Sequence, residues 1–290
     1  MLMKNGHGLL VRILLLISLI GVGLWLRSLQ SATGITGEQT WRPWSKTTMV
    51  TLYFSDGRFL FPVSRRMRTD SDLPHAVLQA LLEGPSARDL ENSIPHEVQL
   101  RSFLLEGGLA HVNLSAPPGD RAATAIIETL TALRGVTSVE LSVGDQRGID
   151  APAKRMPLLY FASAKGLIAI PVKAVKPRDA LEMYLSGPSS PDITGLPPDV
   201  RLLAYDYDSA DRVLSLKFSY TSSVRALAMD RPDRMRTVLL GLIASLTEFS
   251  EVRAVRLDFS GQTRLGLGQC SDLLRTPQTR PVLLNDERLL

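Results

Sequence analysis

The chain repeats itself, and this internal repeat constrains the fold more than any other feature. Leu52-Tyr53-Phe54 returns as Leu159-Tyr160-Phe161, and further matches follow in the same order. Ordered matches over two long segments indicate two copies of one folding unit. The repeat signature consists of Tyr53, Phe54, Gly84, Pro85 and Leu130 in the first copy and of Tyr160, Phe161, Gly187, Pro188 and Leu246 in the second. We interpret these residues as parts of a shared core rather than of a shared site.

Hydrophobic periodicity predicts the order β-β-α-β-β-α-β in each copy. In the first copy, two β-rich runs flank a Ser-Asp-Gly turn, and Gly84-Pro85 ends the apolar helix that follows. The expected elements are strands at 49–54 and 59–67, a helix that ends before Gly84, strands at 98–105 and 109–114, a helix over 122–133 and a strand at 136–143. We therefore expect an α+β fold of two tandem domains after an N-terminal transmembrane helix. Each domain is expected to be a small, mostly antiparallel sheet with two helices packed on one face.

The N-terminal region predicts a membrane anchor. Residues 1–37 contain no Asp or Glu, and Lys4 and Arg12 precede an apolar run at 13–26. Counted from Gly8, the stretch is long enough to cross most bilayers, and the basic residues before it favour a cytoplasmic N-terminus. An uncleaved signal anchor is favoured, and a cleaved signal peptide is the alternative. The chain is then a single-pass protein of the cell membrane with an extracytoplasmic body.

Composition and the repeat together predict the domain organisation. The expected segments are a signal anchor at 1–27, a polar linker at 28–46, a first domain at 47–150, a second domain at 151–263 and a C-terminal tail at 264–290. The second copy has a longer connection before its last helix, at 220–237. Its apolar and basic side chains suit a partner surface: Val224, Arg225, Leu227, Met229, Arg231, Arg234 and Arg236. An equally weighted alternative is that the connection extends the helix and covers the domain's own core.

The sequence offers little for catalysis or metal binding. The four histidines, at positions 7, 75, 96 and 111, fit no metal-ligand spacing, and a nucleophile–base–orienter set would need one of them. Cys270 is the only cysteine, so no intrachain disulfide forms and a passive thiol is expected. The net charge of +4 comes from scattered basic residues, which argues against nucleic-acid binding. We predict no catalytic residue, no cofactor and no metal, and hence a protein that is not an enzyme.

Several short motifs resemble the GerMN-domain family of sporulation and spore germination proteins. They include Leu82-Glu83-Gly84-Pro85 and Ala110-His111-Val112-Asn113-Leu114-Ser115 in the first copy, and Leu185-Ser186-Gly187-Pro188 in the second. The resemblance covers residues 47–263, including the tandem arrangement. It implies an extracytoplasmic protein of spore-forming bacteria, with domains similar to ring-building motifs, that helps to build or anchor a complex at a membrane. Family members are often lipoproteins, whereas this chain has no anchor cysteine.

Repeat, anchor and resemblance together predict a membrane-anchored extracytoplasmic scaffold or interaction protein. Its expected partners are other envelope or sporulation proteins, with the membrane reached through the N-terminal helix. One alternative is a module that binds a cell-wall glycan or peptide, although aromatic residues are only 6% of the chain. Another is a hydrolase with an unrecognised site. A concave pocket with convergent polar groups would favour these alternatives.

Overall fold

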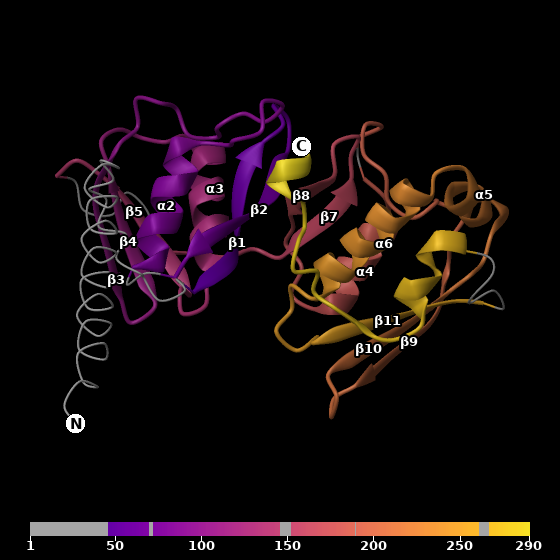
Figure 1. Ribbon diagram of the computed structural model, residues 1–290. Helices are drawn as coiled ribbons and strands as arrows, with labels where there is room; N and C mark the ends of the chain where they lie inside the picture. Colours follow the sequence, from indigo (N-terminus) through magenta and orange to yellow (C-terminus); the bar gives the residue numbers. More distant parts are fainter. Residues whose placement is uncertain (1–45, 70–71, 146–151, 189, 261–266) are drawn as a thin grey trace, which may run out of the picture. The chain divides into compact units, whose positions relative to one another are not determined.

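The computed structural model describes residues 46–69, 72–145, 152–188, 190–260 and 267–290 (Figure 1). Among these residues, no helix is both long and apolar enough to cross a membrane. The predicted anchor at 1–27 and all but the last residue of the predicted linker at 28–46 lie outside the described residues.

The first copy has the predicted order of elements. It consists of β1 (Thr47–Ser55), β2 (Leu60–Arg68), α2 (Leu73–Glu83), β3 (Leu100–Glu106), β4 (Leu109–Leu114), α3 (Asp120–Thr131) and β5 (Ser138–Val143). The helix ends as expected, because Gly84 has a φ of +95°, a conformation that favours glycine. At the start of α2, the Asp72 side chain accepts a hydrogen bond from the backbone N–H of His75.

The second copy repeats this order with one added helix. It consists of β7 (Leu158–Ala162), β8 (Leu167–Pro171), α4 (Pro177–Leu185), β9 (Leu202–Asp208), β10 (Val213–Phe218), α5 (Ser222–Asp230), α6 (Pro232–Leu246) and β11 (Ala254–Phe259). Two short strands, β6 (Ala153–Lys154) and β12 (Gln278–Thr279), and two 3₁₀ helices, η1 (Gly268–Leu274) and η2 (Glu287–Leu289), complete the described elements. The extra helix α5 comes from the longer connection that distinguishes this copy.

The strands form three four-stranded sheets, which differs from the expectation of one sheet for each domain. Each copy keeps its last three strands in a sheet of its own, in the orders β3-β4-β5-β6 and β12-β11-β10-β9. The first hairpins of the two copies instead join as β1-β2-β8-β7, which we call the shared sheet. Side-chain alternation reports which face of a strand is buried but not which strand lies at its edge, so the sequence pattern could not predict this pairing.

Most strand pairs are antiparallel, as expected, with one parallel pair in each copy. These pairs are β4–β5 and β10–β11, and a helical crossover connects the strands in both cases. Strand β6 adds to the first copy's sheet by pairing with β5, although the sequence assigned its residues to the second domain. Leu130 in α3 and Leu246 in α6 are both fully buried, so the repeat signature marks equivalent core positions.

Helix α6 lies close against strand β7 of the shared sheet. Gly241 makes this approach possible, because a Cβ atom there would lie 2.4 Å from the carbonyl oxygen of Tyr160. One turn later, Ser245 accepts a hydrogen bond from the backbone N–H of Tyr160 at 2.8 Å. Helix α6 therefore contacts the backbone of β7 directly, in addition to packing against it through apolar side chains.

Candidate functional site

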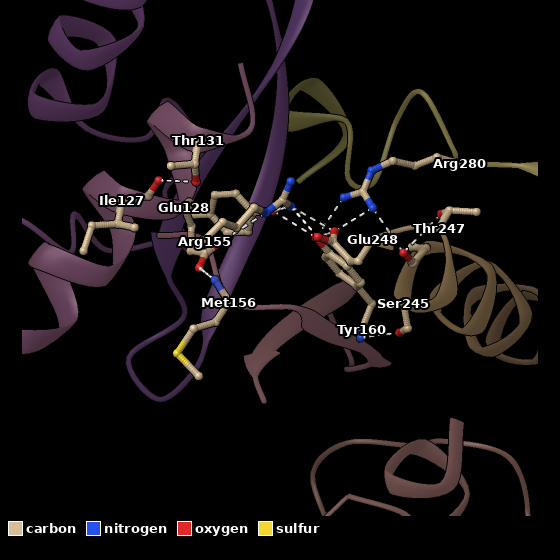
Figure 2. Close-up of polar contacts among 12 residues, drawn as sticks. Ile127, Glu128, Thr131, Arg155, Met156, Tyr160, Ser245, Thr247, Glu248 and Arg280 are labelled. Carbon is tan, nitrogen blue, oxygen red and sulfur yellow. Dashed lines mark hydrogen bonds and ion pairs between the residues drawn. The ribbon is translucent and has the colours of Figure 1, made fainter. Parts of the chain in front are cut away.

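Polar side chains from both copies meet beside the shared sheet, where α3 and α6 end (Figure 2). We call Tyr53, Glu128, Arg155, Tyr160, Glu248 and Arg280 the junction cluster. Both tyrosines are fully buried, and the carboxylate side chains of Glu128 and Glu248 are 2% and 1% exposed. Burial of this many polar groups is costly unless they satisfy one another.

The two tyrosines occupy equivalent positions, and their surroundings repeat. The backbone N–H of Tyr53 in β1 donates to the hydroxyl of Thr129 at 3.1 Å. The N–H of Tyr160 in β7 donates to the hydroxyl of Ser245, the residue equivalent to Thr129. Because β1 and β7 are the edge strands of the shared sheet, these hydroxyls satisfy amides that have no neighbouring strand.

The tyrosine hydroxyls join the copies directly. Their oxygens lie 2.9 Å apart, and Tyr160 donates its proton to a carboxylate oxygen of Glu248 at 2.7 Å. Tyr53 must therefore be the donor in the bond between the two tyrosines. The result is a directed chain of hydrogen bonds from Tyr53 through Tyr160 to Glu248.

Two arginines surround this chain with positive charge. Arg155 lies 3.2 Å from Glu128 and 2.7 Å from Glu248, so it bridges α3 of the first copy and the end of α6 in the second. Arg280 pairs with Glu248 at 2.6 Å and donates to the hydroxyl oxygen of Tyr160 at 2.9 Å. Figure 2 shows both guanidinium groups directed at the Glu248 carboxylate. With both carboxyls ionised, the cluster is electrically neutral.

The environment shifts the pKa values of the cluster in directions that follow from burial. Burial raises the pKa of Tyr160 well above its ordinary value and the neighbouring Glu248 raises it further, while burial also raises the pKa of Tyr53. Both phenols therefore stay protonated. Burial raises the pKa of Glu128 to about 7, and Arg155 opposes that rise only in part. Burial alone would lower the pKa of Arg155, but Glu248 and the tyrosines raise it above its usual value.

The geometry suits a structural connection better than a reaction. Each strong donor and acceptor in the cluster faces another member, and Glu248 accepts from three side chains. A buried ion network adds little net stability, but it penalises every arrangement that leaves a charge unpaired. The cluster therefore selects one arrangement of the two copies.

The cysteine and the histidines that the structure describes lie outside the junction cluster. Among the described residues, no group of three or more His, Cys, Asp or Glu is placed to hold a metal ion. Cys270 is buried on η1, and its thiol donates to the carbonyl oxygen of Pro232. Burial raises the pKa of this thiol, which agrees with the expected passive role. His111 pairs with Glu140 at 2.6 Å, and His75 packs against the ring of Phe103.

The candidate contact residues at 220–237 divide between the core and the surface. Val224 in α5 is fully buried, and Leu227 is partly buried against the core. Arg234 donates to the carbonyl oxygen of Ser163, and Arg236 forms a bidentate pair with Asp272. Arg225, Met229 and Arg231 are exposed. The connection thus covers the domain's own core on one side and presents three of the predicted residues to solvent.

Most of the junction cluster was missed by reading the sequence. Tyr53 and Tyr160 were identified only as core residues, although a buried phenol needs a partner for its hydroxyl. At the offset that relates Leu130 to Leu246, Glu128 corresponds to Ala244, and Glu248 corresponds to Ala132. The charged members therefore have no counterpart in the other copy, and comparison of the repeats could not reveal them.

Fold and site together define a protein of two tandem α+β repeats joined by a shared sheet and a buried polar junction. A family profile described as Germane, sporulation and spore germination, matches residues 51–148 and again residues 158–264. The chain belongs to this family, and the expected GerMN resemblance is confirmed.

Comparison with solved structures reports on the fold. The tandem GerMN domains of the sporulation protein GerM from Bacillus subtilis match with a TM-score of 0.61 at 16% identity, over 83% of this chain and 99% of that one. This likeness shows a common fold. A putative lipoprotein from Clostridium perfringens matches 38% of this chain and 88% of its own, at 24% identity and a TM-score of 0.26. No curated protein matches the chain significantly.

Proposed function

We propose that the chain is a membrane-anchored, extracytoplasmic scaffold protein that contacts other envelope or sporulation proteins as a sporulation or spore-germination complex assembles. Membership of the family supports the process. Lys4, Arg12 and the apolar run at 13–26 support the anchor. The junction cluster is the observation that supports a scaffold role most directly. Its charged side chains pair with one another and hold the two repeats together, so they are not available to bind a substrate.

One polar groove bears on the glycan-binding and hydrolase alternatives. It has a volume of about 480 Å³, lies on the sheet of the second copy, and its lining includes Asp206, Asp208, Arg253 and Arg256. These converging charges are of the kind that a binding or catalytic pocket offers. Among the described residues, no aromatic ring lines the groove, which argues against a glycan as its ligand.

Two edge strands are the surfaces best suited to partners. Strands β3 and β9 are equivalent, and each lies at the end of its sheet with no described strand on its outer side. Leu104 on β3 is 52% exposed and Leu203 on β9 is 53% exposed. An edge strand with exposed apolar side chains is a template for pairing with another protein. The exposed residues Arg225, Met229 and Arg231, on α5 and immediately after it, form a second proposed contact surface.

The edge strands can be tested by introducing charge. In Leu104→Lys and Leu203→Lys, a lysine on the strand edge should block pairing while leaving the buried face intact. Chemical cross-linking in native membranes should then recover fewer partner proteins from each variant, with an unchanged melting temperature. Val175→Lys is the matched control, because Val175 is 83% exposed but lies in the loop before α4. Full recovery from both edge variants would refute this assignment of the contact surface.

Location and ligand class need separate measurements. A reporter that is active only in the cytoplasm, fused after Leu290, should give no signal if the body is extracytoplasmic. Purified cell wall should not sediment the protein. Sedimentation that survives high salt would favour the glycan-binding alternative instead.

A further inference from the structure

The shared sheet has a weak seam where its two hairpins meet. Strands β1 and β2 pair along their whole length, from Thr47 with Arg68 to Ser55 with Leu60. Strands β2 and β8, which join the two copies, pair only at Leu60 and Ala169. Beyond this pair, the facing backbone groups of the two hairpins need other partners.

The C-terminal segment, residues 281–290, supplies partners at the seam. The backbone N–H of Ser64 in β2 donates to the carbonyl oxygen of Asn285 at 2.7 Å, and Ser64 forms a parallel bridge with Asp286. The Leu284 N–H donates to the Ser64 hydroxyl at 3.0 Å. Figure 1 shows this yellow segment beside β2 and β8. The segment thus continues the pairing of β2 where β8 stops.

Asn285 connects both hairpins through one buried side chain. Its amide nitrogen donates to the carbonyl oxygens of Pro62 at 2.6 Å and Leu167 at 2.8 Å, and its amide oxygen accepts from the Leu167 N–H at 2.8 Å. Gly166 leaves room for this contact, because a Cβ atom there would lie 2.3 Å from the Asn285 amide oxygen. The seam therefore contains a receptor shaped for an asparagine side chain.

A second binding site holds Glu287, which follows Asn285 by two residues in the segment. The Glu287 carboxylate accepts from the Arg65 guanidinium at 2.6 and 2.7 Å and from the Ser86 N–H at 2.6 Å. Its side chain is only 7% exposed. Backbone pairing at Ser64, the site for the Asn285 amide and the site for the Glu287 carboxylate together bind a peptide at defined positions.

Polar bonds hold most of the segment, and only Leu284 and Leu290 of its described apolar residues pack partly buried against the core. Val282 and Leu289 are 75% and 85% exposed, and Leu283 is 45% exposed. A hollow of about 550 Å³ remains beside the segment, lined by Met49, Arg66 and Val282 among others. Segments with few buried apolar contacts open locally at a cost well below that of global unfolding.

We propose that the seam between β2 and β8 is a peptide-binding site, and that the C-terminal segment is its reversible ligand. The site selects a peptide with an asparagine and a carboxylate two residues later, at the start of a 3₁₀ turn. When the segment is bound, it fastens the first copy at Ser64 and Arg65 and the second at Leu167. When it leaves, the Leu60–Ala169 pair and the junction cluster still join the two copies, and the backbone groups at Ser64 and Leu167 lose their partners.

The test separates ligand from site. A chain that ends at Arg280, and so keeps the junction cluster, is compared with the full-length chain in detergent. The probe is a labelled synthetic peptide of residues 281–290, followed by fluorescence anisotropy. The shortened chain should bind the peptide saturably, and the full-length chain about tenfold more weakly because its own segment competes. Peptide carrying Asn285→Ala should also bind the shortened chain about tenfold more weakly than the unaltered peptide does. Peptide carrying Arg288→Ala is the control, since that side chain is 81% exposed and pairs only with Asp286. Equal binding of the Asn285→Ala peptide, or no saturable binding by a folded shortened chain, would overturn the proposal.

A second variant covers the case in which the shortened chain does not fold. In full-length Asn285→Ala, amide hydrogen exchange should speed up about tenfold at Ser64 and Leu167, while amides in the β4–β5 pair keep their rates. Full-length Arg288→Ala should exchange as the unaltered chain does. Unchanged rates at Ser64 and Leu167, or an equal rise at every amide, would show that the segment is not a reversible ligand.

Discussion

The buried carboxyl of Glu128 should make the stability of the fold depend on pH. Burial raises its pKa to about 7 from an ordinary value of 4.5, so the folded chain holds this proton over a range in which the unfolded chain has lost it. Below about pH 4.5 the proton is bound in both states and the contribution to stability is complete. As the pH rises through about 7, this contribution is lost.

The size of the effect follows from the two pKa values. Each pKa unit corresponds to about 1.4 kcal/mol, so the free energy of unfolding should fall by about 3 kcal/mol between pH 4 and pH 8 through this group. Glu128→Gln removes the titration and keeps one of the two acceptors, because Arg155 and the Met156 N–H donate to different carboxylate oxygens and a glutamine amide has a single oxygen. Arg155 also keeps its closer partner, Glu248 at 2.7 Å. The lost acceptor costs the variant the same at every pH, so its free energy of unfolding should fall by about 3 kcal/mol less than that of the unaltered chain between pH 4.5 and pH 8.5.

Urea unfolding of residues 46–290 at pH steps from 4.5 to 8.5 measures this difference. Subtracting the two profiles removes the contributions of the other titrating groups. Glu182→Gln is the matched control, because its carboxylate is 63% exposed and pairs with Arg178 on the surface of α4. The control should keep the pH profile of the unaltered chain. The same profile in Glu128→Gln would refute the argument that burial of this carboxyl controls the pH dependence.

Four further substitutions test the packing of the junction and the core. Leu130→Ala and Leu246→Ala should each lower the free energy of unfolding by about 2–5 kcal/mol in urea, because both side chains are fully buried; a cost near zero at both would mean that the core has been assigned to the wrong helix face. Gly241→Ala should cost about 1–3 kcal/mol in the same assay, since the added methyl would meet the Tyr160 carbonyl oxygen, and an unchanged stability would contradict the close approach of α6 to β7. Tyr160→Phe removes the donor to Glu248 and the acceptor for Arg280, so it should cost about 1–3 kcal/mol; a neutral substitution would show that water replaces the hydroxyl.

Local sequence patterns correctly predicted the order of helices and strands. Val77, Leu78 and Leu81 recur at helical spacing and are all fully buried in α2, and Gly84 ends that helix with a positive φ. These features depend on residues close together in the chain. The β2–β8 pairing joins residues more than a hundred positions apart and rests on one register pair, so no local pattern marks it. The sequence therefore predicted the elements and the repeat but not the shared sheet.

The polar junction was unpredictable for a different reason, which lies in its asymmetry. Equivalent tyrosines from two equivalent copies can form only one hydrogen bond between them, and that bond leaves the second phenol proton without an acceptor. Glu248 accepts the proton of Tyr160. No second carboxylate is needed, because the Tyr160 oxygen can then only accept the hydrogen bond from Tyr53. The arginines that balance the buried carboxylates, Arg155 and Arg280, come from the connection between the copies and from the C-terminal region, neither of which is repeated. The arrangement of the two copies is thus fixed by residues that occur once in the chain, and a repeat comparison discards such residues because it keeps only what both copies share.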